Sequence, residues 1–208
     1  RSRIDTILAT NTSSLPVTEI ALGLAHPGRV VGIHFFNPVH KMQLVEVVVG
    51  DRTDPEVADR AVRWVQSIGK LPVVCKDRPG FLVNRILMPY LIEAGLLFAD
   101  GARIEDIDGA MTAFGMPMGP LRLLDEVGLD VAWHAADGMA SAFDGRLPRP
   151  AVLEEIAKKG LLGRKSGAGF YVYPEGKARP RVNDDVARLA VAGASSRLPR
   201  AELVERMI

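Results

Sequence analysis

The sequence has very little cysteine: Cys75 is the only one in 208 residues, beside four histidines. A single cysteine excludes a disulfide within the chain. The cysteine and the histidines lie at spacings that match no zinc-binding pattern. We therefore expect no metal site.

The chain also lacks an excess of charge of either sign and any long apolar run. It has 26 lysines and arginines against 25 acidic residues, which argues against a dedicated nucleic-acid surface. No apolar run reaches the length that crosses a bilayer, and the first residues lack a signal-peptide profile, so we expect a cytoplasmic protein. With 48% hydrophobic residues, the chain can bury one good core or two modest ones.

The hydrophobic period changes along the chain. Short β-rich runs alternate with helical runs up to residue 74, as in α/β units, and the period is helical from residue 79 onward. The segment 77–80, Asp-Arg-Pro-Gly, separates the two regimes. The predicted strands are 7–9, 30–35, 44–49 and 72–74, and the predicted helices are 17–25, 55–68, 80–94, 104–113, 120–127, 131–143 and 150–159.

His34 stands near the end of an apolar strand and is followed by Asn37-Pro38. Ligands of open α/β sheets bind beyond the carboxyl ends of strands, and an imidazole there can accept a proton from a substrate hydroxyl. The alternative is a hydrogen-bonded structural histidine, which is the commoner case for an isolated histidine.

Glu46 is out of place in the apolar run 44–49, since an unpaired buried charge is costly. If the two runs are neighbours in one sheet, Glu46 can orient the ring of His34 and stabilise its charged form. The alternative is a solvent-facing carboxylate on a half-exposed strand. The absence of strict alternation argues against that alternative.

Two more polar sites interrupt patterns. Asn84 falls on the predicted buried stripe of a helix with Phe81, Met88 and Leu91, so its amide either bonds to another backbone element or faces a ligand. The cluster 10–14, which includes Ser13, reads as a turn with an N-cap or as a loop that holds a substrate oxygen.

Several long motifs resemble the 3-hydroxyacyl-CoA dehydrogenase family in order and spacing. They are NTSSL at 11–15, HFFNP at 34–38, LVEV at 44–47, KDRPGFLVNR at 76–85, PMGPL at 117–121, LDEVGLD at 124–130 and LGRKSGAGFY at 162–171. The resemblance covers nearly the whole chain. It implies an α/β plus all-α fold, in which the C-terminal part of a Rossmann-type nucleotide domain precedes a helical domain.

The resemblance also implies roles for individual residues. His34 would be the catalytic base that accepts the proton of the 3-hydroxyl group, and Glu46 would orient it. Ser13 and Asn84 would bind the substrate, and Asn37 would lie close to the nicotinamide end of NAD. The implied reaction is the oxidation of (S)-3-hydroxyacyl-CoA to 3-oxoacyl-CoA in fatty-acid β-oxidation.

One motif of that family is missing. No G-x-G-x-x-G loop occurs in the 208 residues, so the NAD site is expected to be incomplete. We expect a partial dinucleotide-binding domain at 1–77 and a helical substrate-binding and dimerisation domain at 78–200.

The last residues resemble an earlier segment. Residues 203–208 echo residues 82–87, and we expect 201–208 to begin a possible second helical copy. The chain most resembles the multifunctional α-subunits of fatty-acid oxidation complexes, so we expect a fragment of such a protein, a homodimer, and possibly a thiolase subunit as partner. The alternative is an inactive fragment that binds acyl-CoA or only dimerises.

Overall fold

The structure is a computed structural model that describes residues 3, 5–13, 15–176, 178–190 and 198–208. The chain divides into two compact units, Arg1–Arg85 and Ile86–Ile208. None of the described helices combines the length and the hydropathy that a bilayer span requires.

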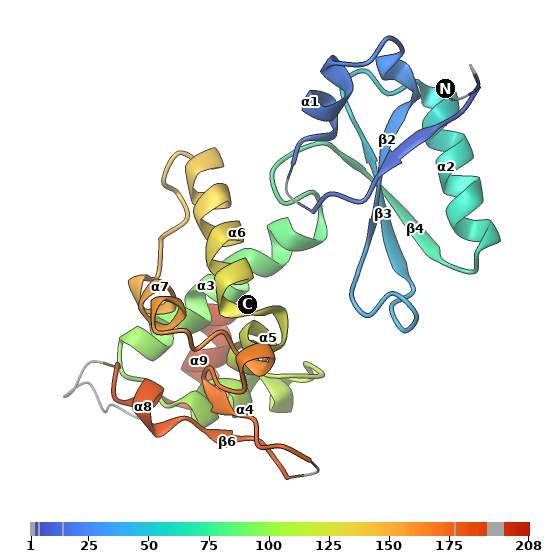
Figure 1. Ribbon diagram of the computed structural model, residues 1–208. Helices are drawn as coiled ribbons and strands as arrows, with labels where there is room; N and C mark the ends of the chain where they lie inside the picture. Colours follow the sequence, from blue (N-terminus) through green and yellow to red (C-terminus); the bar gives the residue numbers. More distant parts are fainter. Residues whose placement is uncertain (1–2, 4, 14, 177, 191–197) are drawn as a thin grey trace. The chain divides into compact units, whose positions relative to one another are not determined.

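The first unit is a four-stranded sheet with helices on both faces. Its strands are β1 (Leu8–Thr10), β2 (Val30–Phe35), β3 (Leu44–Val49) and β4 (Leu71–Lys76), and they lie side by side in that order (Figure 1). β1 is parallel to β2, β3 runs antiparallel to β2, and β4 is parallel to β3. The remaining elements are α1 (Val17–Leu22), the 3-10 turn η1 (Pro27–Arg29) and α2 (Pro55–Ser67).

The two faces of the sheet pack against different helices. Val31, Ile33, Val45 and Val47 pack against α2 in one apolar cluster. Val30 and Val48 point to the other face, where α1 and Phe81 cover them. Because both faces are buried, the two central strands are apolar at nearly every position, and a polar side chain there needs a specific partner.

The second unit is mainly helical. Its helices are α3 (Val83–Ala99), which begins in the last residues of the first unit, α4 (Ile104–Phe114), α5 (Pro120–Val127), α6 (Leu129–Ala142), α7 (Ala151–Lys158), α8 (Asp184–Ala187) and α9 (Arg200–Met207). A 3-10 turn, η2 (Arg164–Ser166), and a small hairpin of β5 (Tyr171–Val172) and β6 (Arg181–Val182) complete the unit. This α/β sheet followed by a helical unit agrees with the predicted fold class.

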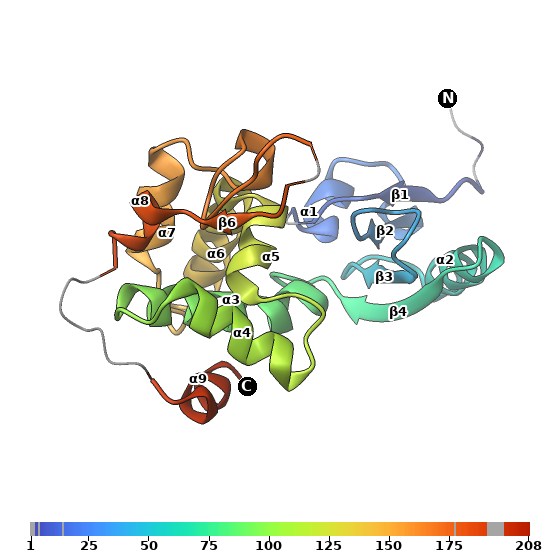
Figure 2. The same cartoon turned by 90° about the horizontal axis from the view of Figure 1, so that it is seen from below.

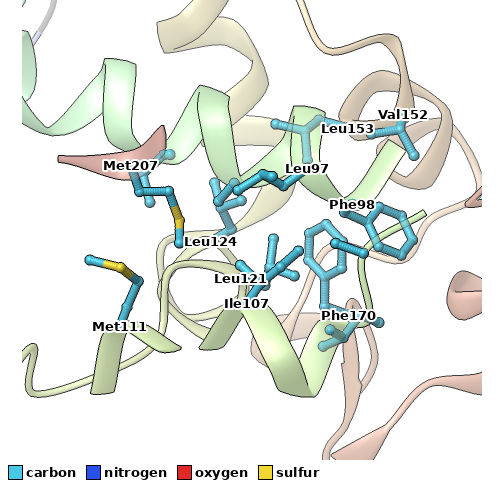
Figure 3. Packing of buried hydrophobic residues seen from close by; sticks show 14 of the residues in the cluster. Leu97, Phe98, Ile107, Met111, Leu121, Leu124, Val152, Leu153, Phe170 and Met207 are labelled. Carbon is cyan, nitrogen blue, oxygen red and sulfur yellow. The ribbon is translucent and has the colours of Figure 1, made fainter. Parts of the chain in front are cut away.

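One apolar core holds the helical unit together. Phe98 of α3 meets the ring of Phe170 edge to face, with the ring centroids 5.2 Å apart (Figure 3). The helix α9 packs against α4 (Figure 2). Its Leu203 and Met207 side chains are buried in the core of the unit. An ion pair of 2.6 Å between Arg206 and Glu93 connects α9 to α3.

The structure corrects the predicted bounds of the long helix. Gly80 and Phe81 both have positive φ angles, so the helix begins at Val83 instead of residue 80. It continues to Ala99, past the predicted end at residue 94. Gly95 lies inside the helix, where a Cβ would be in ordinary van der Waals contact, at 3.4 Å, with Leu153 of α7 and with Pro150 before it.

Candidate active site

His34 and Glu46 face each other across neighbouring strands. The antiparallel register of β2 and β3 pairs the two residues directly, on the face of the sheet that carries α1 and Phe81. The imidazole Nδ1 lies 2.6 Å from the carboxylate Oε2, and the two side chains are 8% and 0% exposed. The contact predicted from the sequence is therefore present, because the two runs are neighbours in one sheet.

The second oxygen of Glu46 binds the start of α3. Its Oε1 accepts hydrogen bonds from the backbone N–H groups of Leu82, at 2.9 Å, and Val83, at 2.8 Å. The first N–H groups of a helix have no partner within the helix, and the helix dipole favours a negative charge beside them. Glu46 thus satisfies three donors.

These contacts decide the ionisation state of the carboxylate. Burial by itself would raise the pKa of Glu46, but the hydrogen bonds from His34, Val83 and Leu82 outweigh burial and lower the pKa below its ordinary value of 4.5. An ionised Glu46 only accepts hydrogen bonds, so the Nδ1 of His34 donates to it. The other ring nitrogen of a neutral His34, Nε2, is then a proton acceptor.

Aromatic rings surround the imidazole. Phe36 meets the ring of His34 edge to face at a centroid distance of 4.8 Å, and Phe81 does so at 5.7 Å. Both contacts are apolar. They fix the plane of the imidazole without competing for its nitrogen atoms.

The other predicted site residues lie on segments next to this pair. Asn84 is half-buried and follows Val83, one of the residues that bind Glu46. Ser13 is exposed in the bend after β1, and Asn37 is exposed after β2. Among the described residues, none of the three hydrogen-bonds to His34 or Glu46, whose partners are each other and the N–H groups of Leu82 and Val83.

The loops after β1 and β2 meet at one edge of the sheet. The two strands are parallel, so their carboxyl ends lie together, and the side chain of Asn11 accepts a hydrogen bond of 3.0 Å from the backbone N–H of Phe35. Ser13 and Asn37 belong to these two loops. Small polar groups at this edge suit the binding of a ligand that carries oxygen or amide groups.

Asp77 is a structural residue that the sequence pattern did not reveal. The prediction placed it in the connection between the two regimes. In the structure it is buried, and it accepts hydrogen bonds from the N–H groups of Val17, at 3.0 Å, and Thr18, at 2.7 Å. The side chain of Pro16 cannot cap α1, so a distant carboxylate does so. The sequence feature that could have indicated this role is the position of the carboxylate directly after an apolar strand.

A cleft in the first unit lies apart from the His34–Glu46 pair. An open cleft of about 820 Å³ lies between β1 and α2. Its lining includes Ile33 and Ala61, which belong to the α2 face of the sheet and not to the face of His34. Among the described residues, no group of three or more histidine, cysteine or carboxylate side chains could hold a metal ion.

The chain is thus an α/β unit with a buried imidazole–carboxylate pair, followed by a helical unit. Two family models match the chain. Residues 2–78 match the 3-hydroxyacyl-CoA dehydrogenase NAD binding domain, and residues 80–173 match the 3-hydroxyacyl-CoA dehydrogenase C-terminal domain. The chain belongs to the 3-hydroxyacyl-CoA dehydrogenase family.

Solved structures agree with this assignment. The chain is 44% identical to FadB2 of M. tuberculosis, with a TM-score of 0.81, over 83% of this chain and 62% of that one. It is 42% identical to 3-hydroxybutyryl-CoA dehydrogenase from Escherichia coli K12, with a TM-score of 0.77, over 83% of this chain and 38% of that one. It is 30% identical to the dehydrogenase part of multifunctional enzyme 1 from C. elegans, with a TM-score of 0.66, over 99% of this chain and 47% of that one. The chain thus spans less than two thirds of each of these relatives.

NAD is the cofactor of the domain that residues 2–78 match. Asn37 is exposed in the loop after β2, where its amide is free to meet a ligand. The sequence contains no G-x-G-x-x-G loop to bind the pyrophosphate. This chain therefore supplies part of a dinucleotide site.

Proposed function

We propose that this chain carries the catalytic base and part of the substrate site of an NAD-dependent 3-hydroxyacyl-CoA dehydrogenase. The reaction is the oxidation of (S)-3-hydroxyacyl-CoA to 3-oxoacyl-CoA in fatty-acid β-oxidation. The single observation that carries the proposal is the buried contact of 2.6 Å between His34 and an ionised Glu46. Family membership and a relative described as 3-hydroxybutyryl-CoA dehydrogenase support it.

The pair is suited to removing the proton of a secondary alcohol. The Nε2 of His34 accepts the proton of the 3-hydroxyl group, and Glu46 stabilises the positive charge that the ring gains. Because Glu46 is held by two backbone N–H groups, it does not have to reorganise when that charge appears. Bound NAD would supply the acceptor for the hydride that leaves carbon 3.

The polar residues near the pair complete the proposed site. Ser13 and Asn84 bind the 3-oxygen of the substrate, and Asn37 lies at the nicotinamide end of the cofactor. In each case a hydroxyl or an amide group is offered to a ligand that has oxygen or amide atoms to match. We further propose a cytoplasmic homodimer, with a thiolase subunit as a possible partner.

A second candidate function follows from the missing Gly-rich loop. A chain without a pyrophosphate loop loses the backbone N–H groups that hold a dinucleotide. Such a chain would bind acyl-CoA without catalysis, or would serve only in dimerisation.

Calorimetric titration of the chain separates these candidates, with NADH and acetoacetyl-CoA as separate ligands. Saturable binding of both supports the dehydrogenase and contradicts the inactive fragment. Binding of acetoacetyl-CoA alone supports the acyl-CoA-binding fragment, and failure of both ligands leaves the dimerisation role.

Matched histidine variants locate the binding site. His34→Gln should weaken acetoacetyl-CoA binding about five- to tenfold, the equivalent of one hydrogen bond. His134→Gln changes an exposed ring in the helical unit and should leave the binding unchanged. Equal affinities in the two variants would remove His34 from the substrate site.

A further inference from the structure

Phe81 has a backbone conformation that a bulky residue rarely adopts. Its φ angle is 45°, and the φ angle of the preceding Gly80 is 75°. A glycine adopts a left-handed conformation without strain, but a phenylalanine does so at a cost in free energy. The turn is closed by a hydrogen bond of 2.8 Å from the N–H of Phe81 to the carbonyl of Arg78.

The ring of Phe81 holds the strained turn in place. The residue is only 6% exposed and packs in the apolar cluster on the α1 face of the sheet. Its ring also meets the imidazole of His34 edge to face. Burial of an aromatic ring is worth enough to offset the backbone strain. The other buried members of the cluster are Val17, Ala21, Val30 and Val48.

The strained residue stands directly before the two donors of Glu46. Leu82 and Val83 follow Phe81 in the chain, and both point their N–H groups at the same carboxylate oxygen. The backbone torsion angles at Phe81 set the direction of the peptide groups that follow. A change at Phe81 therefore moves the donors that keep Glu46 ionised.

We propose that Phe81 is a positioning residue of the His34–Glu46 pair: its buried ring anchors a left-handed turn that aims the N–H groups of Leu82 and Val83 at Glu46. This proposal rests on the proposed function, in which the pair removes the substrate proton. It assigns to Phe81 no contact with the substrate. Its effect passes through the carboxylate to the ring of His34.

Carboxyl ¹³C NMR of the chain labelled at its glutamates measures the pKa of Glu46 directly, without substrate or cofactor. The Glu46 resonance is assigned with Glu46→Gln and followed against pH in the wild type and in Phe81→Gly and Phe81→Leu. Glycine adopts the turn without strain but has no ring, whereas leucine keeps much of the buried volume. Phe36→Leu is the matched control, because Phe36 contacts His34 and stands far along the chain from the two donors.

The titration midpoint of the Glu46 carboxyl group should rise by about one pH unit or more in Phe81→Gly. Burial raises this pKa, and in the variant the hydrogen bonds from Leu82 and Val83 that oppose burial are weaker. The midpoint should rise less in Phe81→Leu. Phe36→Leu removes a ring from His34 but leaves the turn at residues 80 and 81 intact, so the amides of Leu82 and Val83 should exchange there at the wild-type rate. Amide hydrogen exchange of Leu82 and Val83 should be at least about tenfold faster in Phe81→Gly than in Phe36→Leu.

A folded Phe81→Gly variant with the wild-type midpoint and wild-type exchange would overturn the proposal and leave Phe81 as a core residue only. If the glycine variant does not fold, Phe81→Leu decides: exchange of the two amides no faster than in Phe36→Leu overturns the proposal. These readouts do not involve ligands. A failure of the acetoacetyl-CoA titration would thus count against the proposed function and not against the role of Phe81.

Discussion

The two units each bury a carboxylate, and the two carboxylates differ in their third partner. Glu46 and Asp125 are 0% and 1% exposed, and each accepts two backbone N–H groups. The third donor is the imidazole of His34 in the sheet unit and the hydroxyl of Tyr173 in the helical unit. Only the imidazole can become a cation near neutral pH.

This difference separates the two pKa values. Burial dominates at Asp125 and raises its pKa to about 6, although the backbone groups of Tyr171 and Phe170 and the hydroxyl of Tyr173 oppose the rise. At Glu46 the imidazole and the helix start outweigh burial, and the pKa is lowered. The same arrangement of donors thus holds a loop in one unit, and in the other it holds the imidazole that the proposed function uses as a base.

The largest expected effect is the loss of Glu46. Glu46→Ala leaves the imidazole and two backbone N–H groups without their acceptor, and breaking such a buried pair costs about 3–5 kcal/mol. Urea denaturation followed by circular dichroism measures the free energy of unfolding. Glu56→Ala, an exposed glutamate at the start of α2, is the control and should change stability by less than about 0.5 kcal/mol. A loss below about 1 kcal/mol at Glu46 would contradict the account of the pair.

A smaller loss is expected at the helical counterpart. Asp125→Asn keeps one acceptor oxygen and introduces an amide that has to find its own partner, at a cost of about 1–3 kcal/mol. The same denaturation measurement applies, with Asp59→Asn on an exposed position of α2 as the control. A loss at Asp125 equal to that at Glu46 would mean that the histidine adds nothing to the pair.

The sequence predicted the sheet pair better than its helical counterpart, and the reason is distance along the chain. His34 and Glu46 were conspicuous because each is polar within an apolar strand, and their strands are consecutive. Asp125 binds a segment 45 residues away, and Asp77 binds one 60 residues away. No local window connects such partners, so the sequence alone does not name the groups that these carboxylates bind.

The helical unit shows the same limit. Asp108 of α4 accepts hydrogen bonds from the N–H groups of Leu121 and Arg122 and thereby caps α5. The sequence predicted α5 from residue 120 to residue 127 correctly but could not name its cap. A Cβ on Gly119 would lie 2.2 Å from the Asp108 carboxyl carbon, so that glycine is explained only once the cap is known.

The pH dependence of stability should have opposite signs in the two units. Asp125 has a folded pKa of about 6, above the ordinary 3.8, so its folded state binds more protons and stability falls as the pH rises from about 4 to 6. Glu46 has a folded pKa below 4.5, so its contribution is present above pH 4.5 and is lost as the pH falls through the folded value.

Thermal unfolding of the wild type and Asp125→Asn across this range tests the sign. The difference in free energy between the two proteins should change on the order of 2 kcal/mol between pH 4 and pH 7. The loss of stability with rising pH should be absent from the asparagine variant, because its side chain does not titrate. A difference that is constant with pH would show that Asp125 is already ionised when folded at pH 4.

The smallest expected effect is at an exposed ion pair of the helical unit. Arg164 lies 2.7 Å from Glu126, with side chains 62% and 26% exposed, so water and salt screen the attraction. Arg164→Ala should cost less than about 1 kcal/mol, and raising the salt concentration should reduce that cost further. By distance alone, this pair would be expected to stabilise the fold as much as His34 and Glu46, whose separation is 2.6 Å. Burial makes the difference, because the sheet pair has no solvent to replace a lost partner. An Arg164→Ala cost near that of Glu46→Ala would contradict this explanation.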